Sequence, residues 1–369
     1  MKLVTLLFFG LLAMLSSCAG QQLPARPAPQ AFGDTVSAID KGALCIFQDR
    51  DDIYWFGSDG EGVYRYDGKT LLRFDTIHGL CNGRIRSIQQ DSAGNMYFNT
   101  VHGISKFDGK KFVTLVSTKS SLPHGGWRPH PADLWFTGAQ DSGVVYRYDG
   151  TTLHRLQFPE TKAGKEFFVK FPRSQNPQMT FSPYDVYSIF KDSKGNYWFG
   201  TNIGLCRYTP ALQPGQPGAF EWMSEEEIGI DAIAIHVRST VEDKHGKFWF
   251  GNIMHRFDVY RKDIQQRGKA PLTYRKESGI VASKEHDAAY FMSATEDNEG
   301  NVWTVTYNKG AWRYDGTHLT QYKVQDGDKD VTLFSNYKDR HGNLWLGTHT
   351  AGVYKFNGKT FEKFVFYRN

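Results

Sequence analysis

Histidine, aspartate, arginine and aromatic side chains stand at a few positions of this 369-residue chain where they could act together. An arginine holds a carboxylate or phosphate through paired hydrogen bonds, and an aromatic ring stacks on the apolar face of a ligand. We therefore predict a site for an anionic or carbohydrate ligand. Its predicted members are Arg84, Trp127, Arg128, Tyr184, Asp185, His236, Arg238 and Tyr290.

A catalytic role is the alternative for part of this set. His236, His286 and Asp287 could form an acid–base group of a lyase or hydrolase, or could bind a metal. This requires a histidine within hydrogen-bond reach of a carboxylate or of a second histidine. Because no tight catalytic motif accompanies them, we favour a binding protein with no cofactor and no metal. A third possibility is a scaffold, which would present an exposed apolar patch and no pocket.

A repeated segment must position these side chains. Its clearest copy reads Asp-Arg-His-Gly-Asn-Leu-Trp-Leu-Gly-Thr over residues 339–348, and 192–201 is a second. In six copies an aromatic residue follows the aspartate by six positions, and a seventh copy, with Asp133 before Trp135, is irregular. The aromatic residues are Trp55, Tyr97, Trp135, Trp198, Trp249, Trp303 and Trp345.

Each copy predicts four short antiparallel strands. In the unit of Trp198, β-type runs at 185–190, 197–199 and 205–208 are separated by glycine-containing turns. In other units an Asp-Gly turn leads into a fourth run, as at Asp67-Gly68. Seven such units predict an all-β fold, a closed seven-bladed β-propeller over residues 36–369.

The third unit departs from the pattern. Pro129 stands where the aspartate is expected, and three prolines fall within residues 122–131. Proline cannot donate to a sheet ladder, so a central strand is excluded there. We predict that the innermost strand of blade three is distorted and that the ring is locally open.

The repeats differ mainly on one face. The Asp-x-x-Gly-Asn and Asp-Gly turns are short and uniform, whereas the insertions at 159–183, 209–230 and 261–289 belong to the opposite face. Variable loops on a rigid scaffold carry binding sites, so we place the site on the insertion face, over the central channel. Seven residues before the repeat aspartate stand Gly42, Arg84, Asp185, His236, Tyr290 and Thr332. Two residues further on stand Leu44, Arg86, Tyr187, Arg238, Met292 and Phe334.

Two uniform features are interpreted as structural. The positions one residue further on carry small side chains. Such side chains let neighbouring blades approach closely, and we do not expect them to act as nucleophiles. This column of small residues reads Cys45, Ser87, Ser188, Ser239, Ser293 and Ser335. The repeat aspartate is expected to cap backbone amides of its turn, because the loops lack the ligand spacing of a calcium site.

The repeat resembles that of the two-component regulator propeller family. The shared pattern is D-x-x-G-N-x-W-F-G-T followed by G-[LV]-x-x-[YF]-D-G, and His78-Gly79-Leu80 matches the Gly-Leu that often opens these repeats. The resemblance covers about residues 36–369. The repeat pattern is also similar, more distantly, to the propeller of streptogramin-inactivating lyases. The resemblance to the regulator family implies a periplasmic sensory input domain; kinase activity is not expected of this chain.

The N-terminus predicts export and lipidation. Lys2 precedes an apolar run at 3–15, and Leu-Ser-Ser-Cys at 15–18 resembles a lipobox. We expect residues 1–17 to be a signal peptide, Cys18 to be the lipidated residue, and 18–35 to be a flexible tether. The protein would then be lipid-anchored in the bacterial envelope, at the outer membrane. The sequence does not indicate whether it faces the periplasm or the exterior.

Composition limits the partners. The net charge of +5 falls to +4 without the signal peptide, and no run of lysine and arginine suggests nucleic acid. Cys45, Cys81 and Cys206 lack the paired spacing of a zinc site. We expect a monomer that binds a small molecule, a glycan or an envelope protein, and that meets the membrane only through its lipid.

Overall fold

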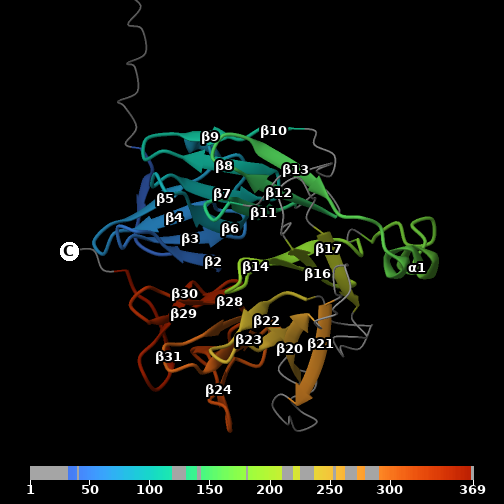
Figure 1. Ribbon diagram of the computed structural model, residues 1–369. Helices are drawn as coiled ribbons and strands as arrows, with labels where there is room; N and C mark the ends of the chain where they lie inside the picture. Colours follow the sequence, from blue (N-terminus) through green and yellow to red (C-terminus); the bar gives the residue numbers. More distant parts are fainter. Residues whose placement is uncertain are drawn as a thin grey trace, which may run out of the picture. The chain divides into compact units, whose positions relative to one another are not determined.

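The computed structural model describes residues 32–39, 41–118, 130–138, 143–179, 182–209, 219–224, 237–251, 255–261, 272–278 and 291–366 (Figure 1). Seven sheets of mostly antiparallel strands follow one another along this part of the chain. They confirm the predicted seven-bladed β-propeller.

The first three blades take up residues 34–157. Blade one contains β2 (Ala43–Gln48), β3 (Tyr54–Ser58), β4 (Val63–Tyr66) and β5 (Leu71–Phe74), with β1 (Asp34–Val36) added at its outer edge. After the short 3-10 helix η1 (Thr76–His78), blade two contains β6 (Ile85–Gln90), β7 (Met96–Thr100), β8 (Gly103–Phe107) and β9 (Phe112–Thr114). Blade three contains β10 (Ser117–Thr118), β11 (Leu134–Thr137), β12 (Val144–Tyr148) and β13 (Leu153–Gln157).

The remaining four blades follow the helix α1 (Lys162–Lys170). Blade four contains β14 (Val186–Lys191), β15 (Tyr197–Thr201), β16 (Gly204–Thr209) and β17 (Ala219–Ser224). Blade five contains β18 (Thr240–Glu242), β19 (Phe248–Phe250), β20 (His255–Arg261) and β21 (Leu272–Ser278). Blade six contains β22 (Phe291–Glu296), β23 (Val302–Thr306), β24 (Ala311–Tyr314) and β25 (Leu319–Tyr322). A hairpin of β26 (Gln325–Asp326) and β27 (Lys329–Asp330) leads to blade seven, with β28 (Leu333–Lys338), β29 (Leu344–Thr348), β30 (Val353–Phe356) and β31 (Phe361–Lys363).

The repeat aspartate holds each regular blade together at its first turn. In blade seven, Oδ1 of Asp339 accepts the backbone N–H groups of His341 and Asn343 at 3.0 and 2.8 Å. Its Oδ2 accepts the indole N–H of Trp345 at 2.9 Å. The aspartates at 49, 192, 243 and 297 bind their tryptophans in the same way, at 2.7–2.9 Å. The turn role was predicted, but the bond to the buried indole was not.

Blade three lacks this arrangement. Oδ2 of Asp133 accepts instead from Nε of Arg147 at 2.6 Å, inside the blade. Its sheet runs in the order β10-β13-β12-β11, and β10 pairs with β13 in the parallel direction at the opposite edge from β11. Among the described residues, β11 is therefore the innermost strand of this blade. The proline-rich segment 122–129 that predicted the irregularity lies outside the described residues.

The ring is closed by packing between two complete blades. β31 completes blade seven, and β1 only adds an edge to blade one. Across the junction, the hydroxyl of Tyr54 donates to Asp339 at 2.6 Å, and its ring lies 4.9 Å from that of Trp345. No strand of the described chain is exchanged between these blades.

The compact unit begins at Phe32, a few residues before the predicted boundary at 36. Phe32 stacks on Phe107 of blade two, with ring centroids 5.6 Å apart, and β1 pairs with β5. The signal segment and Cys18 lie outside the described residues. Among the described residues, no helix is long and apolar enough to cross a membrane.

Removal of one turn carboxylate should weaken the fold. In Asp339→Asn an amide N–H group would face a backbone or indole donor, so we expect a loss of about 2–4 kcal/mol of unfolding free energy. Burial alone would raise the pKa of Asp339, but hydrogen bonds from Tyr54, Trp345 and Asn343 outweigh it and lower the pKa. This stabilisation is present above the unfolded-state pKa of about 3.9 and is lost as the pH falls through the lower folded-state value.

Thermal unfolding measured between pH 3 and 7 tests this expectation. The control is Asp108→Asn, because Asp108 caps an exposed Asp-Gly turn through two backbone N–H groups only. Equal losses of melting temperature in the two variants would contradict the role assigned to the indole bond.

Candidate functional site

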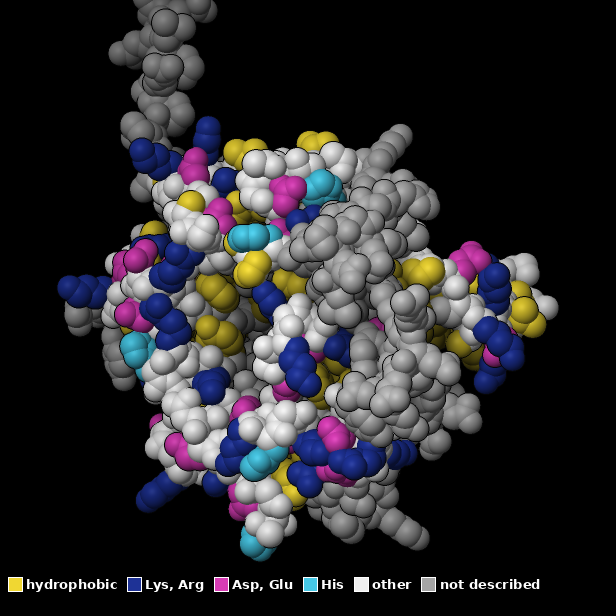
Figure 2. All heavy atoms as spheres, in the orientation of Figure 1, with side chains coloured by type: hydrophobic (Ala, Val, Ile, Leu, Met, Phe, Trp, Pro, Cys, Tyr) yellow, Lys and Arg dark blue, Asp and Glu magenta, His cyan; other side chains and the backbone are white. Residues whose placement is uncertain are grey.

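A cavity of about 440 Å³ lies where the inner strands of six blades meet. Its lining combines cationic, aromatic and apolar side chains. The lining residues are Arg86, Ser87, Thr137, Gly138, Asp185, Val186, Tyr187, Ile189, Arg238, Met292 and Phe334. In Figure 2, basic and hydrophobic side chains lie close together near the middle of the described surface. Because blades two to seven each contribute, the cavity sits on the axis of the ring.

Backbone bulges aim these side chains at the cavity. β14 pairs with β15 at Val186↔Thr201 and next at Ser188↔Gly200, so Tyr187 has no partner in the ladder. A bulged residue is left unpaired and the strand bends, which re-aims its side chain. The same interruption occurs in blades one, two, six and seven, at Leu44, Arg86, Met292 and Phe334. Arg238 occupies the corresponding repeat position in blade five.

The largest group of cavity-lining residues stands five positions before the repeat aspartate, whereas the largest group of predicted site residues stands seven positions before it. Asp185 and Arg238, both predicted, line it, and Arg84 stands just before the bulge residue Arg86. Arg86 and Tyr187 were recognised as variable positions but were not assigned to the site. The bulge explains the difference, since it turns the column five residues before the repeat aspartate inward. Counting along the repeat identifies these positions but does not show the direction in which their side chains point.

Tyr184 has a different role from the stacking that was predicted. It is not among the lining residues; its hydroxyl accepts the backbone N–H of Thr161, the N-cap residue of α1, at 2.9 Å. Tyr184 therefore fastens the helical insertion to blade four. Six predicted positions lie outside the described residues: Trp127, Arg128, His236, His286, Asp287 and Tyr290.

Arg86 is the most unusual group of the cavity. Although its side chain is exposed to the channel, no hydrogen bond or ion pair joins it to another described residue. Loss of solvent around the guanidinium lowers its pKa, and the positive charge of Arg84 lowers it further. A cation held in this way has unused capacity for a ligand, because a guanidinium can donate five N–H groups.

The charge of Arg84 is balanced by an ion pair, unlike that of Arg86. Arg84 makes an ion pair with Oδ1 of Asp59, in the turn after β3. Oδ2 of Asp59 lies 3.6 Å from Nε2 of His349, in the turn after β29. The predicted arginine therefore belongs to a paired cluster at the rim.

The floor of the cavity combines a stacked cation with one acid. The guanidinium of Arg238 lies over the ring of Tyr187, 4.5 Å from its centroid, which is a cation–π arrangement. Asp185 is the one acidic residue of the lining, and Oδ2 accepts the backbone N–H of Ser182 at 2.8 Å. Burial raises the pKa of Asp185. The lining therefore carries two arginines against one carboxyl.

The small column lies where blades meet, as predicted. A Cβ atom added to Gly200 would come 2.0 Å from the carbonyl oxygen of Val237 in the next blade and 2.4 Å from Oγ of Ser188. Oγ of Ser188 donates to that same carbonyl at 3.1 Å. Cys45, Cys81 and Cys206 form no disulfide, and burial raises the pKa of Cys206 well above its ordinary value.

Residues 180–202, which include β14 and β15, match the family described as "Two component regulator propeller". This segment of blade four therefore matches a two-component regulator propeller repeat. This confirms the resemblance found in the sequence. The match covers one complete turn-and-strand segment of blade four, with Asp192, Trp198 and the bulge residue Tyr187 inside it.

Similar proteins include a histidine kinase, a two component system and a lyase. A relative named "Histidine kinase P4", from Formosa agariphila, is 25% identical over 181 residues, which are 46% of this chain and 12% of the kinase. The extracellular domain of BT4673 from B. thetaiotaomicron, described as a hybrid two component system, has a TM-score of 0.55 and 20% identity, covering 87% of this chain and 39% of that one. A streptogramin B lyase has a TM-score of 0.57 and 14% identity, covering 87% and 96%. The structural similarities establish the fold, and this chain spans less than half of the BT4673 chain.

The propeller should become more stable when Arg86 loses its charge. In Arg86→Met a side chain of similar length removes a partly desolvated cation that lies close to Arg84. Functional positions commonly cost stability in this way, so we expect a melting temperature higher by about 1–2 °C. Arg84→Met is the matched control, because it breaks the ion pair with Asp59 and should bring no gain. A fall in melting temperature for Arg86→Met as large as that of the control would contradict this assignment.

Proposed function

We propose that this protein is an extracytoplasmic sensor-type propeller whose central cavity binds a small anionic ligand. The observation that carries the proposal is Arg86, a guanidinium that a bulge directs into the cavity and that makes no ion pair with a described carboxylate. A carboxylate, phosphate or sulfate group of a ligand would supply the missing negative charge. The bidentate geometry of arginine would also fix its orientation.

The rest of the lining suggests the size and character of the ligand. Its volume of about 440 Å³ falls within the range typical of small-molecule sites. The Tyr187–Arg238 stack offers a flat surface for a sugar ring, and Met292 and Phe334 offer apolar contacts. Asp185 could accept a hydrogen bond from a hydroxyl group. We therefore favour a small acidic sugar or a comparable anion over a protein partner.

The sensory part of the proposal rests on the repeat family and on similar proteins. The repeat is shared with regulator propellers, and extracellular domains of two component systems are among the structural neighbours. We propose that this chain holds its propeller outside the cytoplasm through a lipid on Cys18. Residues 18–31 would then serve as the tether. Ligand occupancy would be reported to a partner in the envelope.

Ligand screening tests the cavity directly. Purified protein would be heated with matched pairs of compounds, such as glucuronate and glucose, and the shift in melting temperature measured. We expect the acidic member to bind and Arg86→Gln to weaken its affinity at least tenfold, since a charged hydrogen-bonded pair is lost. Arg65→Gln is the control, because Arg65 of β4 pairs with Asp67 and is not part of the cavity lining.

Three outcomes would count against this function. Acidic compounds could all fail to bind, neutral partners could bind equally well, or Arg86→Gln could leave the affinity unchanged. Chemical conversion of a bound compound, followed by mass spectrometry, would instead support the alternative of a lyase or hydrolase.

Lipidation is tested by Cys18→Ala in the full chain. A covalent lipid anchors a protein to the bilayer without spanning it, so the wild-type protein should sediment with membranes. The variant should appear in the soluble extracytoplasmic fraction. Export of wild-type protein in soluble form would refute the anchor while leaving the cavity proposal intact.

A further inference from the structure

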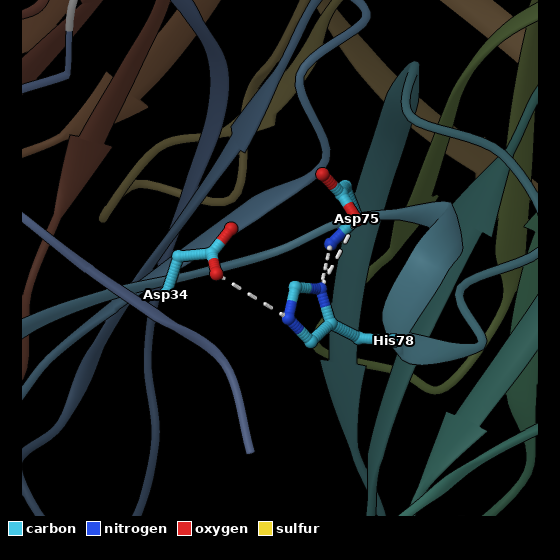
Figure 3. A group of neighbouring side chains, drawn as sticks. All are labelled: Asp34, Asp75 and His78. Atoms are coloured by element: carbon cyan, nitrogen blue, oxygen red, sulfur yellow. Dashed lines mark hydrogen bonds and ion pairs between the residues drawn. The ribbon is translucent and has the colours of Figure 1, made fainter. Parts of the chain in front are cut away.

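A second group of polar side chains lies away from the central cavity, at the outer edge of blade one (Figure 3). Asp34 belongs to β1, Asp75 directly follows β5, and His78 ends the short helix η1. One oxygen or nitrogen of each residue lies within 4.8 Å of the others. The repeat frame does not require these three residue types together, because β1 and η1 are additions to the four-stranded blade.

His78 contains a buried nitrogen without a hydrogen-bond partner among the described residues. Only 6% of its side chain is exposed, and its ring lies edge-on to Phe32 and Phe74, with centroids 6.3 and 6.0 Å away. Nε2 points at Oδ1 of Asp34, but the 3.8 Å between them is too long for a hydrogen bond. A buried polar atom without a partner costs about 1–3 kcal/mol. Such an atom, aimed at a carboxylate, indicates that something belongs between them.

The other ring nitrogen shows which tautomer suits a ligand. Nδ1 accepts the backbone N–H of Asp75 at 3.2 Å, which closes the capping box of η1, and it also lies 3.1 Å from Oδ1 of Asp75. This bond places the proton of the neutral ring on Nε2. A metal ion could bind only if the proton moved to Nδ1, which would then donate to Oδ1 of Asp75 in place of accepting the backbone N–H and would leave a lone pair on Nε2 that faces Asp34. This is the usual arrangement around a metal-binding histidine, whose second nitrogen donates to a carboxylate.

We propose that Nε2 of His78 and Oδ1 of Asp34 bind a divalent transition-metal ion of the zinc class. Zinc lies about 2.0–2.2 Å from such ligands, so a tetrahedral pair would be about 3.3–3.6 Å apart. The observed 3.8 Å therefore requires a movement of only a few tenths of an ångström. Water would complete the coordination, and Asp75 would orient the imidazole. Imidazole nitrogen selects zinc, copper or nickel over magnesium and calcium.

Arg73 limits the affinity but leaves the ligand atoms available. Its guanidinium lies 3.0 Å from Oδ2 of Asp34 and 3.6 Å from Oδ2 of Asp75. Both Oδ1 atoms still face the imidazole. Two carboxylates and one guanidinium give the group a net charge of −1 before the ion binds. We therefore expect a modest, reversible site rather than a permanent structural one.

The consequence of binding would be local. β1 is held to β5 over three residues only, Asp34 to Val36. An ion that joins Asp34 to His78 would fasten this edge strand to the segment after β5. The propeller itself would not need the ion to fold.

The test is a titration of untagged, chelator-treated protein at pH 7.5 with zinc, and separately with magnesium, by calorimetry and thermal shift. We expect one zinc ion per chain and no response to magnesium. His78→Gln and Asp34→Asn should each weaken zinc binding at least tenfold. His154→Gln is the matched control, since His154 already bonds to Asp149 at 2.6 Å and should bind no ion.

Each outcome decides the proposal. Zinc binding that is lost in both site variants and retained in His154→Gln supports it. Absence of zinc binding, or binding unchanged in Asp34→Asn and His78→Gln, overturns it. Circular dichroism of each variant confirms that the propeller is folded, so that lost binding reflects lost ligands. Failure here would leave the anion site of the central cavity untouched.

Discussion

The hydrogen bond between a turn aspartate and a buried indole is the interaction on which this propeller depends. One carboxylate serves the turn through Oδ1 and the blade core through Oδ2, as Asp192 does with Lys194, Asn196 and Trp198. The geometry of the first hairpin and the position of the largest core side chain are thereby fixed together. A charge-assisted bond in a buried setting is strong, and its loss would leave both a donor and a charge unsatisfied. Five blades use a tryptophan here, and blade two uses the hydroxyl of Tyr97.

This rigid frame is what allows the inner strands to be irregular. In blades one, two, four, six and seven the pairing of first and second strands contains a bulge, and in four of these blades the residue at the bulge lines the cavity. The residue after the bulge is small and lies where the next blade packs. The uniform turns and core residues determine the fold, and the residues at the bulges are therefore free to vary for ligand recognition. Arg86 shows the cost of that separation, because its pKa is lowered by loss of solvent and by the charge of Arg84, while the side chain makes no ion pair within the described fold.

The fold could be predicted from the sequence because the same strand-and-turn pattern recurs along the chain. The period and the glycine turns gave seven units, and the six-residue spacing from aspartate to an aromatic residue marked six of them. The sequence singled out blade three as irregular; there Asp133 bonds to Arg147 and not to a tryptophan, while Pro129 lies outside the described residues. The candidate site was less predictable. Asp185 and Arg238 were found by counting from the repeat aspartate, but a period-two strand pattern places residues 84 and 86 on the same face. A bulge changes that alternation, and no residue type in these strands marks it.

Departures from the repeat also explain what the sequence could not reveal at the N-terminus. Residues 18–35 were expected to be a tether, and His78 was recognised only as the start of a Gly-Leu signature. Their meeting depends on β1 returning to β5, a contact between positions about forty residues apart that no periodicity reports. If the chain is anchored at Cys18, any pull on the tether reaches the propeller first at this three-residue ladder. The ladder is short, and besides its main-chain bonds it is joined only by the ion pair between Arg73 of β5 and Asp34 of β1, so further side-chain reinforcement must come from the segment next to β5. The Asp34–His78 contact lies there, which gives this surface a physical role independent of the ligand in the channel.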